Sequence, residues 1–264
     1  FGRFEGSSLQ MDTVLYPDLP FIDLVLVVDW RERHRILKLS VPTHVSAGTV
    51  TCDTAYGAVE RESDGEEHPV QQWVDLSGAI GETDYGVAVI NDSRYGFDVR
   101  DGDIRTSLLR GAPYAWHDPA ELHPDGSYPY QDQGEHVFRF RLFPHRGDWR
   151  TSGVIRQGLS LNTPAISEVE AAHPGSLPSS WGFLECAPPN VQAGAVKLAE
   201  AGEDLVLRLV ERHGRAVEAR VRVPLTGASL TVPLQPYEIR TLRVTVSDWE
   251  LSWCETDLLE RPRS

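Results

Sequence analysis

Cysteine is scarce in this chain. Its 264 residues include three cysteines, Cys52, Cys186 and Cys254, which lie far apart in the sequence. Three scattered thiols cannot form a disulfide framework or a Cys-x-x-Cys metal site, and an odd number is typical of a reducing compartment. The sequence therefore predicts a cytoplasmic protein whose cysteines are small buried hydrophobic residues rather than nucleophiles.

Long hydrophobic runs and excess positive charge are also missing. The longest apolar run, residues 24–28, has the length of a strand and ends at Asp29, whereas a transmembrane helix needs about 18 apolar residues or more. The chain has 39 acidic and 25 basic residues, a formal net charge of −14. This charge repels phosphate groups and anionic lipid, so we expect no nucleic-acid or membrane partner. Neutral or cationic ligands fit better.

The common catalytic motifs are absent too. The sequence has no G-x-S-x-G, no H-E-x-x-H, no P-loop and no G-x-G-x-x-G after a strand, and its nine histidines are dispersed. Asp101-Gly-Asp103 is typical of a turn, with a cation site as the alternative. The acidic run at residues 60–67 is interpreted as a solvated loop, with a cation or a basic partner as alternatives. We assign no catalytic residue and no metal ligand to this chain.

Short strands dominate what the sequence does contain. Runs rich in Val, Ile, Leu and aromatic residues are separated by Gly, Pro, Asp and Ser, a spacing typical of an antiparallel sandwich. Residues 135–143 alternate most cleanly between polar and apolar and predict a strand with a core face and a wet face. The best helical candidate, residues 167–173, is barely two turns long and precedes Pro174. A Pro- and Gly-rich connector at residues 159–180 predicts two β subdomains, residues 1–173 and 174–264.

Two polar features follow apolar strands and are candidate ligand sites. Asn91, Asp92, Ser93, Arg94 and Tyr95 suit either a tight Asx-type turn or hydrogen bonding to sugar hydroxyls. Arg110 ends an apolar strand just before a turn, where its guanidinium could reach a ligand or form a surface ion pair. The aromatic residues that could stack on a sugar ring, or simply fill the core, are Trp73, Tyr114, Trp116 and Trp149.

Several stretches resemble, in the same order, the C-terminal β region of glycoside hydrolase family 38. They are PFIDLVLVVDWRERHRILKLSVP (20–42), PVQQWVDLS (69–77), GVAVINDSRYG (86–96), SLLR (107–110), GEH (134–136), LFPHRG (142–147), LSLNTP (159–164), AVKLAE (195–200), LRLVERHG (207–214) and PYEIRTLR (236–243). The resemblance is greatest to the cytosolic and bacterial branch and covers nearly the whole chain. It implies an all-β fold: a large antiparallel β-sandwich of the supersandwich, galactose-mutarotase-like kind, followed by a smaller β-sandwich.

The function that the resemblance implies is retaining hydrolysis of terminal α-D-mannosyl residues. In the family, zinc or another divalent cation and an Asp nucleophile lie in an N-terminal catalytic domain, so this chain is expected to hold no cofactor and to be inactive alone. The start at Phe1, without an initiating methionine or a signal peptide, predicts a piece of such an enzyme. Its partners would be the catalytic domain and a mannoside.

The resemblance also implies which residues of this chain approach the mannose pocket. Arg110 matches an arginine of the pocket rim, and Asn91, Asp92 and Tyr95 belong to the neighbouring loop; their role would be to orient sugar hydroxyls. The alternatives are a free-standing carbohydrate-binding module that uses the same residues, and a purely structural or homo-oligomerising domain.

One departure from the family is visible near the end of the chain. The strand CETDLLE (254–260) follows PYEIRTLR (236–243), whereas in the family the corresponding strand precedes it. This order predicts a local permutation, with residues 224–229 as the joint. Because strand pairing depends on proximity in space rather than on chain order, the smaller sandwich can keep its fold.

Overall fold

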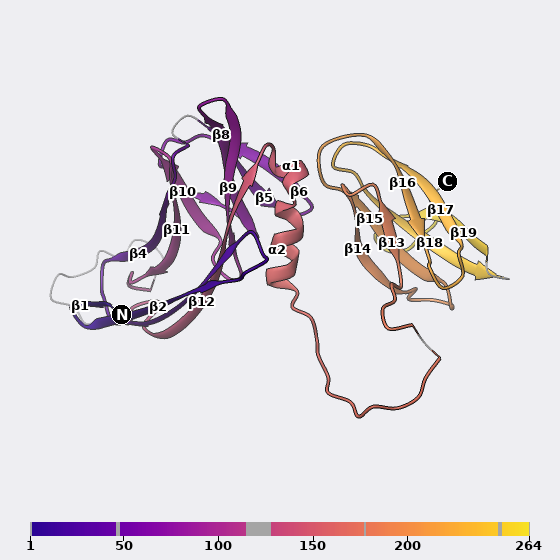
Figure 1. The fold of residues 1–264 in the computed structure, drawn as a ribbon, viewed down its shortest axis with the longest axis horizontal. Coiled ribbons are helices and arrows are strands. Elements are labelled where there is room, and N and C mark those ends of the chain that lie inside the picture. The colour runs from indigo at the N-terminus through magenta and orange to yellow at the C-terminus, as the bar shows by residue number, and fades with distance from the viewer. Residues whose placement is uncertain (1, 46–47, 115–127, 177, 248–249, 264) are drawn as a thin grey trace. The chain divides into compact units, whose positions relative to one another are not determined.

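The computed structural model describes residues 2–45, 48–114, 128–176, 178–247 and 250–263. Within these ranges the chain is almost entirely β, with two short helices (Figure 1). It divides into two compact units, Phe1–Thr54 with Val59–Ile166, and Ala55–Ala58 with Ser167–Ser264. The domain boundary predicted at Pro174 falls in a stretch without regular secondary structure that follows the first unit. The all-β prediction, a large antiparallel sandwich followed by a smaller one, is confirmed.

The first unit is built on two antiparallel sheets of unequal width. The larger sheet has the order β1 (Gly2–Phe4), β2 (Ser7–Leu15), β3 (Ile22–Trp30), β12 (Gly134–Arg146), β9 (Thr83–Asn91), β8 (Trp73–Ile80), β5 (Thr49–Thr54), β6 (Gly57–Arg61). The smaller sheet has the order β4 (Ile36–Pro42), β11 (Asp103–Arg110), β10 (Gly96–Arg100), β7 (His68–Pro69). The smaller sheet packs on one face of the larger sheet, which leaves the outer face to carry the helices.

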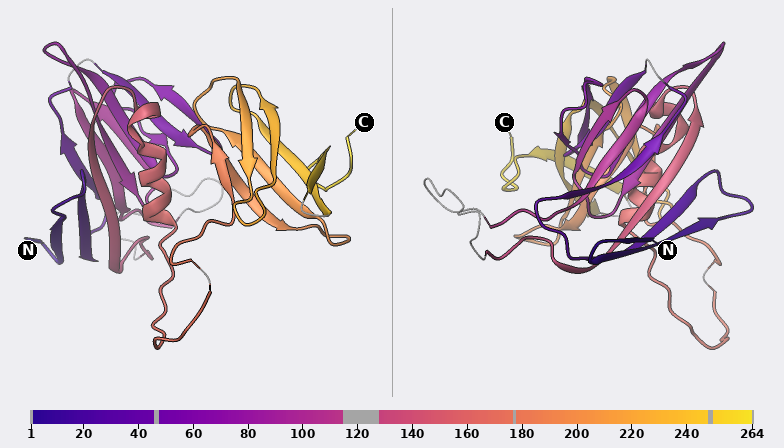
Figure 2. Two further views of the ribbon diagram at one scale, coloured as in Figure 1. Left: turned by 45° about the vertical axis from the view of Figure 1, so that its right-hand side comes forward. Right: turned by 90° about the vertical axis from the view of Figure 1, so that its left-hand side faces the viewer.

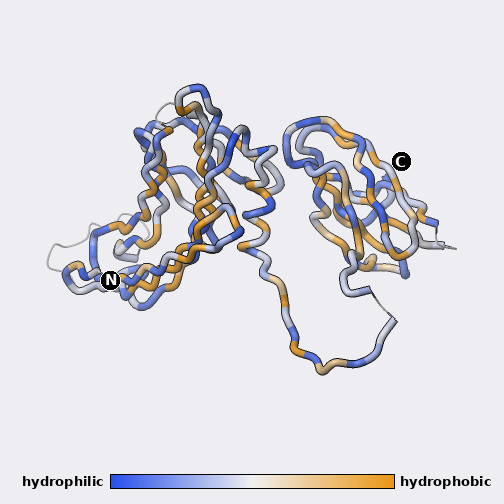
Figure 3. The backbone as a smooth tube through the Cα atoms, in the orientation of Figure 1, coloured by the Kyte–Doolittle hydropathy of each residue, from blue (hydrophilic) through white to orange (hydrophobic). Residues whose placement is uncertain are grey.

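Alternation along the strands explains why the two sheets of the first unit pack together. In β3, Leu24, Leu26 and Val28 point into the core while the residues between them face outward. In β12, Phe138 and Phe140 are buried opposite β3, and the outward Val137 remains 59% exposed. The predicted strand at residues 135–143 is thus confirmed with its core face and wet face, and the alternation recurs along both units in Figure 3. The shared apolar core is the main stabilising contribution.

The two helices lie against the outer face of the larger sheet. Helix α1 (Trp149–Ser152) is followed by α2 (Val154–Asn162), which contacts β8, β9 and β12 (Figure 2). Buried Val154 and Gly158 form the face of α2 that meets the sheet. The helix expected at residues 167–173 is absent, and those residues are exposed; a segment of seven residues with no apolar face to bury does not offset the cost of helix nucleation.

The second unit is a smaller sandwich of three strands against four. Its sheets have the orders β13 (Glu185–Ala187), β16 (Val217–Arg222), β17 (Ser229–Leu234), and β14 (Val191–Leu198), β15 (Leu205–Glu211), β18 (Ile239–Ser247), β19 (Glu250–Thr256). Residues 224–228 form the closed turn of the β16–β17 hairpin, and β19 pairs with β18 at the edge of its sheet. A permuted order relative to the family stays a prediction.

No helix among the described residues is long and apolar enough to cross a membrane. Cys52 is buried, Cys186 is half-buried and Cys254 is exposed. The prediction that all three cysteines are buried is therefore wrong for Cys254, which lies on an edge strand where its side chain faces solvent.

Candidate functional site

Strand register brings the two polar sequence features to the same end of the first unit. Strand β9 ends at Asn91 and β10 begins at Gly96, so the loop between them joins the larger sheet to the smaller one. Strands β10 and β11 are antiparallel, with Phe97 opposite Thr106, which places the start of β10 beside the end of β11. Tyr95 and Arg110 therefore emerge at one end of the smaller sheet.

The side chain and the carbonyl of Asn91 are hydrogen-bonded to the loop and to its neighbours. Its side chain is buried; Nδ2 donates to the Gln71 carbonyl at 2.9 Å, and Oδ1 accepts from the Arg94 N–H at 2.9 Å. The carbonyl oxygen of Asn91 accepts from Asn162 Nδ2 of helix α2, also at 2.9 Å. This geometry is that of the Asx-type turn. A contact between Asn91 and a sugar stays a prediction, and it would require one of these bonds to be exchanged.

Asp92 and Tyr95 are more available than Asn91. One carboxylate oxygen of Asp92 accepts from the Ser93 hydroxyl at 2.8 Å and from the Arg139 N–H at 3.2 Å, while the other has no partner among the described residues. The Tyr95 side chain is 60% exposed. Both can therefore meet a ligand without first losing a buried interaction.

The backbone of Arg110 is held by hydrogen bonds, whereas its side chain is exposed. Its N–H donates to Asp132 Oδ2 at 2.8 Å, and its carbonyl accepts from the Ala112 N–H at 2.8 Å. The next residue, Gly111, is fixed by two backbone hydrogen bonds to the segment before β4, from the His34 N–H at 2.6 Å and to the Arg35 carbonyl at 2.8 Å. The exposed guanidinium pairs with no residue that the structure describes, and the choice between a ligand contact and a surface ion pair stays a prediction.

The β9–β10 loop and Arg110 are linked through three residues that were not predicted as site residues, Asp132, His136 and Phe138. The Phe138 ring contacts the Arg94 guanidinium, 4.4 Å from its centroid, and the His136 imidazole, stacked at 5.9 Å. His136 Nε2 is 2.9 Å from the carbonyl of Asp132, the residue that holds Arg110. Asp132 and Gly134 both adopt positive φ, which marks a tight turn before β12. The Asp-x-Gly spacing was the only local signal for it.

The acidic run forms an exposed loop at residues 62–64 and 66–67, as the solvated-loop interpretation predicts, and its last residue is also tied to the smaller sheet. Glu67 accepts from Lys38 Nζ at 2.5 Å and from the Ser107 hydroxyl. Asp98, which is buried, pairs with the same lysine and with Arg105. Burial works against charge on Lys38, but the two carboxylates outweigh it and raise the pKa of the amine. Basic residues on the outer face of the smaller sheet thus anchor the acidic segment.

The aromatic residues divide into buried and exposed groups. Trp73 and Trp149 are buried and pack on each other at 4.9 Å, so they belong to the interface between α1 and the larger sheet. Tyr114 is exposed, and Trp116 lies outside the described residues. Only Tyr114 among the described members of this set presents a ring to solvent.

The described residues do not fit a metal site. No group of three or more His, Cys, Asp or Glu side chains within them is arranged to hold a metal ion.

Comparison with known proteins identifies the class of this region. Residues 2–126 match the family described as "Glycosyl hydrolases family 38 C-terminal domain". The chain is 33% identical over 231 residues to "Alpha-mannosidase 2C1" of Homo sapiens, which covers 83% of this chain and 20% of that protein. It is 27% identical over 270 residues to "Alpha-mannosidase G" of Dictyostelium discoideum, covering 90% of this chain and 23% of that protein.

Solved structures show the same fold. A glycosyl hydrolase family 38 protein from Enterococcus faecalis superposes with a TM-score of 0.72 at 21% sequence identity, over 89% of this chain and 29% of the other. An alpha-mannosidase from Enterococcus faecalis V583 gives a TM-score of 0.71 at 20% identity, over 89% and 28%. The chain has the β-sandwich fold of the domain that the family model describes as C-terminal. It belongs to glycoside hydrolase family 38, and it spans about a fifth of the length of the curated relatives that it matches.

Proposed function

We propose that this chain is the C-terminal region of a retaining α-mannosidase that removes terminal α-D-mannosyl residues from oligosaccharides. The family match carries the proposal, and the much greater length of the relatives supports placing the nucleophile and the metal in an N-terminal catalytic domain. Zinc or another divalent cation, bound there, would hold mannose hydroxyls. The proposed partners of this chain are that catalytic domain and the mannoside, in the cytoplasm, which the scarcity of cysteine favours.

Arg110 is the residue through which this chain would contribute to the mannose pocket. Its guanidinium is exposed and unpaired among the described residues, and its backbone is held by Asp132 and by the Gly111 turn. Such a donor can bind a sugar hydroxyl without first breaking an ion pair, and a fixed base lowers the entropic cost of orientation. Asp92 and Tyr95 at the same end of the sandwich, and Asn91 if its turn rearranges, would add hydrogen bonds.

Complementation tests the proposal as a whole. The chain alone is expected to release no nitrophenol from nitrophenyl α-mannoside, because it lacks the nucleophile. Mixing it with a separately expressed N-terminal part of the same enzyme should restore hydrolysis. The N-terminal part alone provides the control, and full activity of that part without this chain would contradict the proposed role.

Arg110→Ala in the complete enzyme tests the proposed rim position. Loss of one charge-assisted hydrogen bond of about 1.5–3 kcal/mol should lower kcat/KM roughly tenfold to a hundredfold. Arg146→Ala is the matched control, since Arg146 is exposed near the far end of β12 and forms no ion pair with the described residues. Steady-state kinetics with both variants would show equal kcat/KM values if Arg110 lies outside the pocket.

A free-standing carbohydrate-binding module remains the second candidate, because exposed Tyr95 and unpaired Arg110 lie at one end of the same sheet. Isothermal calorimetry of the chain with methyl α-mannoside separates the two functions. Binding of the mannoside that the Arg110→Ala substitution abolishes would favour the module. If the chain binds no mannoside at Arg110 without the catalytic domain, the chain has a supporting or homo-oligomerising role.

A further inference from the structure

An apolar groove opens on the first unit between the start of β4 and the edge formed by β1 and β2. Two hollows of about 160 and 480 Å³ share Phe4, Trp30 and Leu37 in their walls, and Leu9 and Ile36 extend the apolar lining. The Phe4 side chain is 51% exposed, and Ile36 is 49% exposed. Apolar side chains that are buried between the sheets elsewhere in this unit thus stay open to solvent here.

Strand register shows that β2 turns apolar side chains toward the groove. Leu9 pairs with Val28 and Met11 with Leu26, and directly paired residues of an antiparallel ladder point to the same face. Leu26 and Val28 are buried in the core between the sheets, whereas Met11 is 47% exposed, and Leu15 on the same face is 70% exposed. The inner face of β2 is therefore apolar and only partly covered by the described residues.

Strand β4 forms an unpaired edge of the smaller sheet beside this groove. Its one neighbour among the described strands is β11, so about half of its backbone N–H and C=O groups have no strand partner there. Soluble proteins commonly protect such an edge with a charged side chain, often a lysine. The lysine of β4, Lys38, is instead held by Glu67 and Asp98, and Leu37 and Leu39 pack against the core. The edge of β4 is therefore open to pairing with an extended segment.

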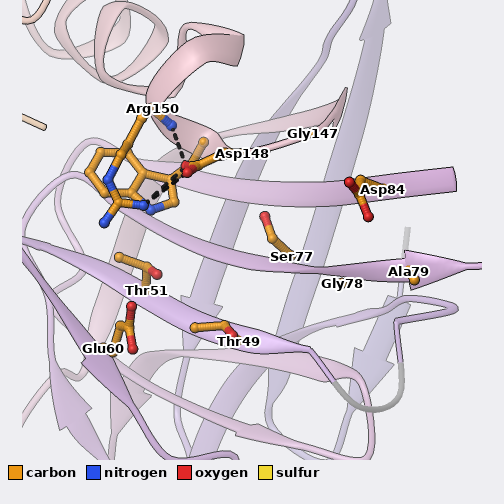
Figure 4. A pocket seen from close by; sticks show the side chains of 11 residues that line it. Thr49, Thr51, Glu60, Ser77, Gly78, Ala79, Asp84, Gly147, Asp148 and Arg150 are labelled. Carbon is orange, nitrogen blue, oxygen red and sulfur yellow. Dashed lines mark hydrogen bonds and ion pairs between the residues drawn. The ribbon is translucent and has the colours of Figure 1, made fainter.

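A polar hollow of the same unit shows by contrast why the groove favours an apolar partner. This hollow lies between β5, β6, β8, β9 and the start of α1, and Glu60, Asp84, Asp148 and Arg150 are among the side chains around it (Figure 4). Asp148 is paired with Arg150, and the exposed Glu60 and Asp84 are open to water, which satisfies their carboxylates. The apolar side chains of the groove lower their free energy only when another apolar surface covers them.

A β-strand placed next to β4 would cover the groove. Leu37 of β4 and Leu9 of β2 line the same hollow, so a strand beyond β4 would run over the inner face of β2. Neighbouring strands lie about 4.8 Å apart and packed sheets about 10 Å apart, a spacing at which side chains interdigitate. The main chain of the added strand would pair with the β4 edge, and every second side chain would pack on Leu9 and Met11. The occupant is thus an extended segment with apolar residues at alternate positions.

The source of this strand rests on the function proposed above. The chain covers 20% and 23% of two curated relatives, so most of an enzyme of their length would lie outside it. Gly2 lines the smaller hollow, and the polypeptide that would precede it in such an enzyme reaches the groove without a long connection. We propose that a β-strand from the N-terminal part of the same enzyme adds to the edge of β4 and fills the groove with its apolar side chains.

Hydrogen exchange of this chain and of the complete enzyme tests the surface without an activity measurement. In the chain alone, the β4 amides that face away from β11 should exchange fast. In the complete enzyme we expect the same amides to exchange at least roughly tenfold more slowly, because the added strand accepts their hydrogen bonds. Equal exchange of these amides in the two proteins would overturn the proposal.

Met11→Lys tests the apolar side of the groove. Because Met11 is half-exposed in this chain, the substitution should leave the chain folded and the exchange of its β4 amides unchanged. In the complete enzyme a lysine cannot be buried there without cost, and exchange of the β4 amides should rise roughly tenfold. Val14→Lys is the matched control, since Val14 pairs with Asp23 on the opposite face of β2 and should change neither protein. Unchanged β4 exchange in the Met11→Lys enzyme would contradict the proposed contact.

Sedimentation velocity of the chain alone distinguishes a different occupant. If the chain forms a dimer that Met11→Lys dissociates, a second copy fills the groove and the proposal is wrong. Neither measurement depends on mannoside hydrolysis. Protected β4 amides in a complete enzyme without mannosidase activity would therefore support this surface and refute the proposed function, whereas unprotected β4 amides in an active mannosidase would refute the surface alone.

Discussion

Glu211→Ala is expected to destabilise the second unit by about 3–5 kcal/mol, because five partly buried donors would lose their shared acceptor at once. Glu211, the last residue of β15, is fully buried. Its carboxylate accepts from Asn190 Nδ2 at 2.8 Å, and from the N–H groups of His213, Gly214, Arg215 and Tyr237 at 2.8–3.0 Å. One side chain thus ties three turns together. Hydrogen exchange would locate the loss in the second unit.

Glu218→Ala is the matched control for this substitution. Glu218 is an exposed residue of β16 without a hydrogen-bonded side-chain partner in the described structure, so its removal should change stability by less than about 0.5 kcal/mol. If the two variants showed the same protection of backbone amides against hydrogen exchange in the second unit, the Glu211 carboxylate would not hold these turns.

The Glu211 carboxylate also predicts a loss of stability in acid. Burial alone would favour the neutral carboxyl, but the Tyr237 N–H, Asn190 and the other donors outweigh it and lower the pKa of Glu211. A glutamate in the unfolded chain has a pKa of about 4.3. The stabilisation is therefore fully present above that pH and is lost as the pH falls through the lower folded pKa. Denaturation at a series of pH values should show a smaller acid dependence in Glu211→Gln.

Gly111→Ala should lower the free energy of unfolding of the first unit by about 2–4 kcal/mol, because the added methyl group has no space. A Cβ at this position would lie 2.2 Å from the Glu32 carbonyl oxygen and 3.3 Å from the Arg33 Cα, both of which are backbone atoms. The turn after β11 must then move and lose its hydrogen bonds to His34 and Arg35. Denaturant unfolding measures the effect.

The same substitution should also move Arg110, its neighbour, and reduce kcat/KM of a complete enzyme if Arg110 lines the pocket. Gly175→Ala is the matched control, because a Cβ there meets no atom within 4 Å and the residue lies outside regular structure. Unchanged stability in Gly111→Ala would show that the segment before β4 can shift. The Gly111 turn would then not fix the position of the Arg110 backbone.

The strand at residues 135–143 could be predicted because its alternation is a local property, and it lies within β12. Helix α2 could not, because residues 154–162 become an interface only when β8, β9 and β12 provide a sheet beneath them. At the candidate site, Arg110 ends an apolar strand and Tyr95 follows one, and these positions allowed both residues to be predicted from the sequence. Asp132 was not, since it contacts Arg110 across 22 residues of sequence and has no pattern of its own.

Composition, strand alternation and motif order are properties of the chain, so a pair of β-sandwiches with little cysteine, a net charge of −14 and the motifs of family 38 could be predicted before folding was considered. Which polar side chains form hydrogen bonds and which remain available depends on the folded arrangement of the strands. The side chains of Asn91 and Glu67 found partners, whereas the Arg110 guanidinium did not, within the described residues. Hydrogen-bond partners come from strands distant in sequence, and so they are fixed only when the sheets pair.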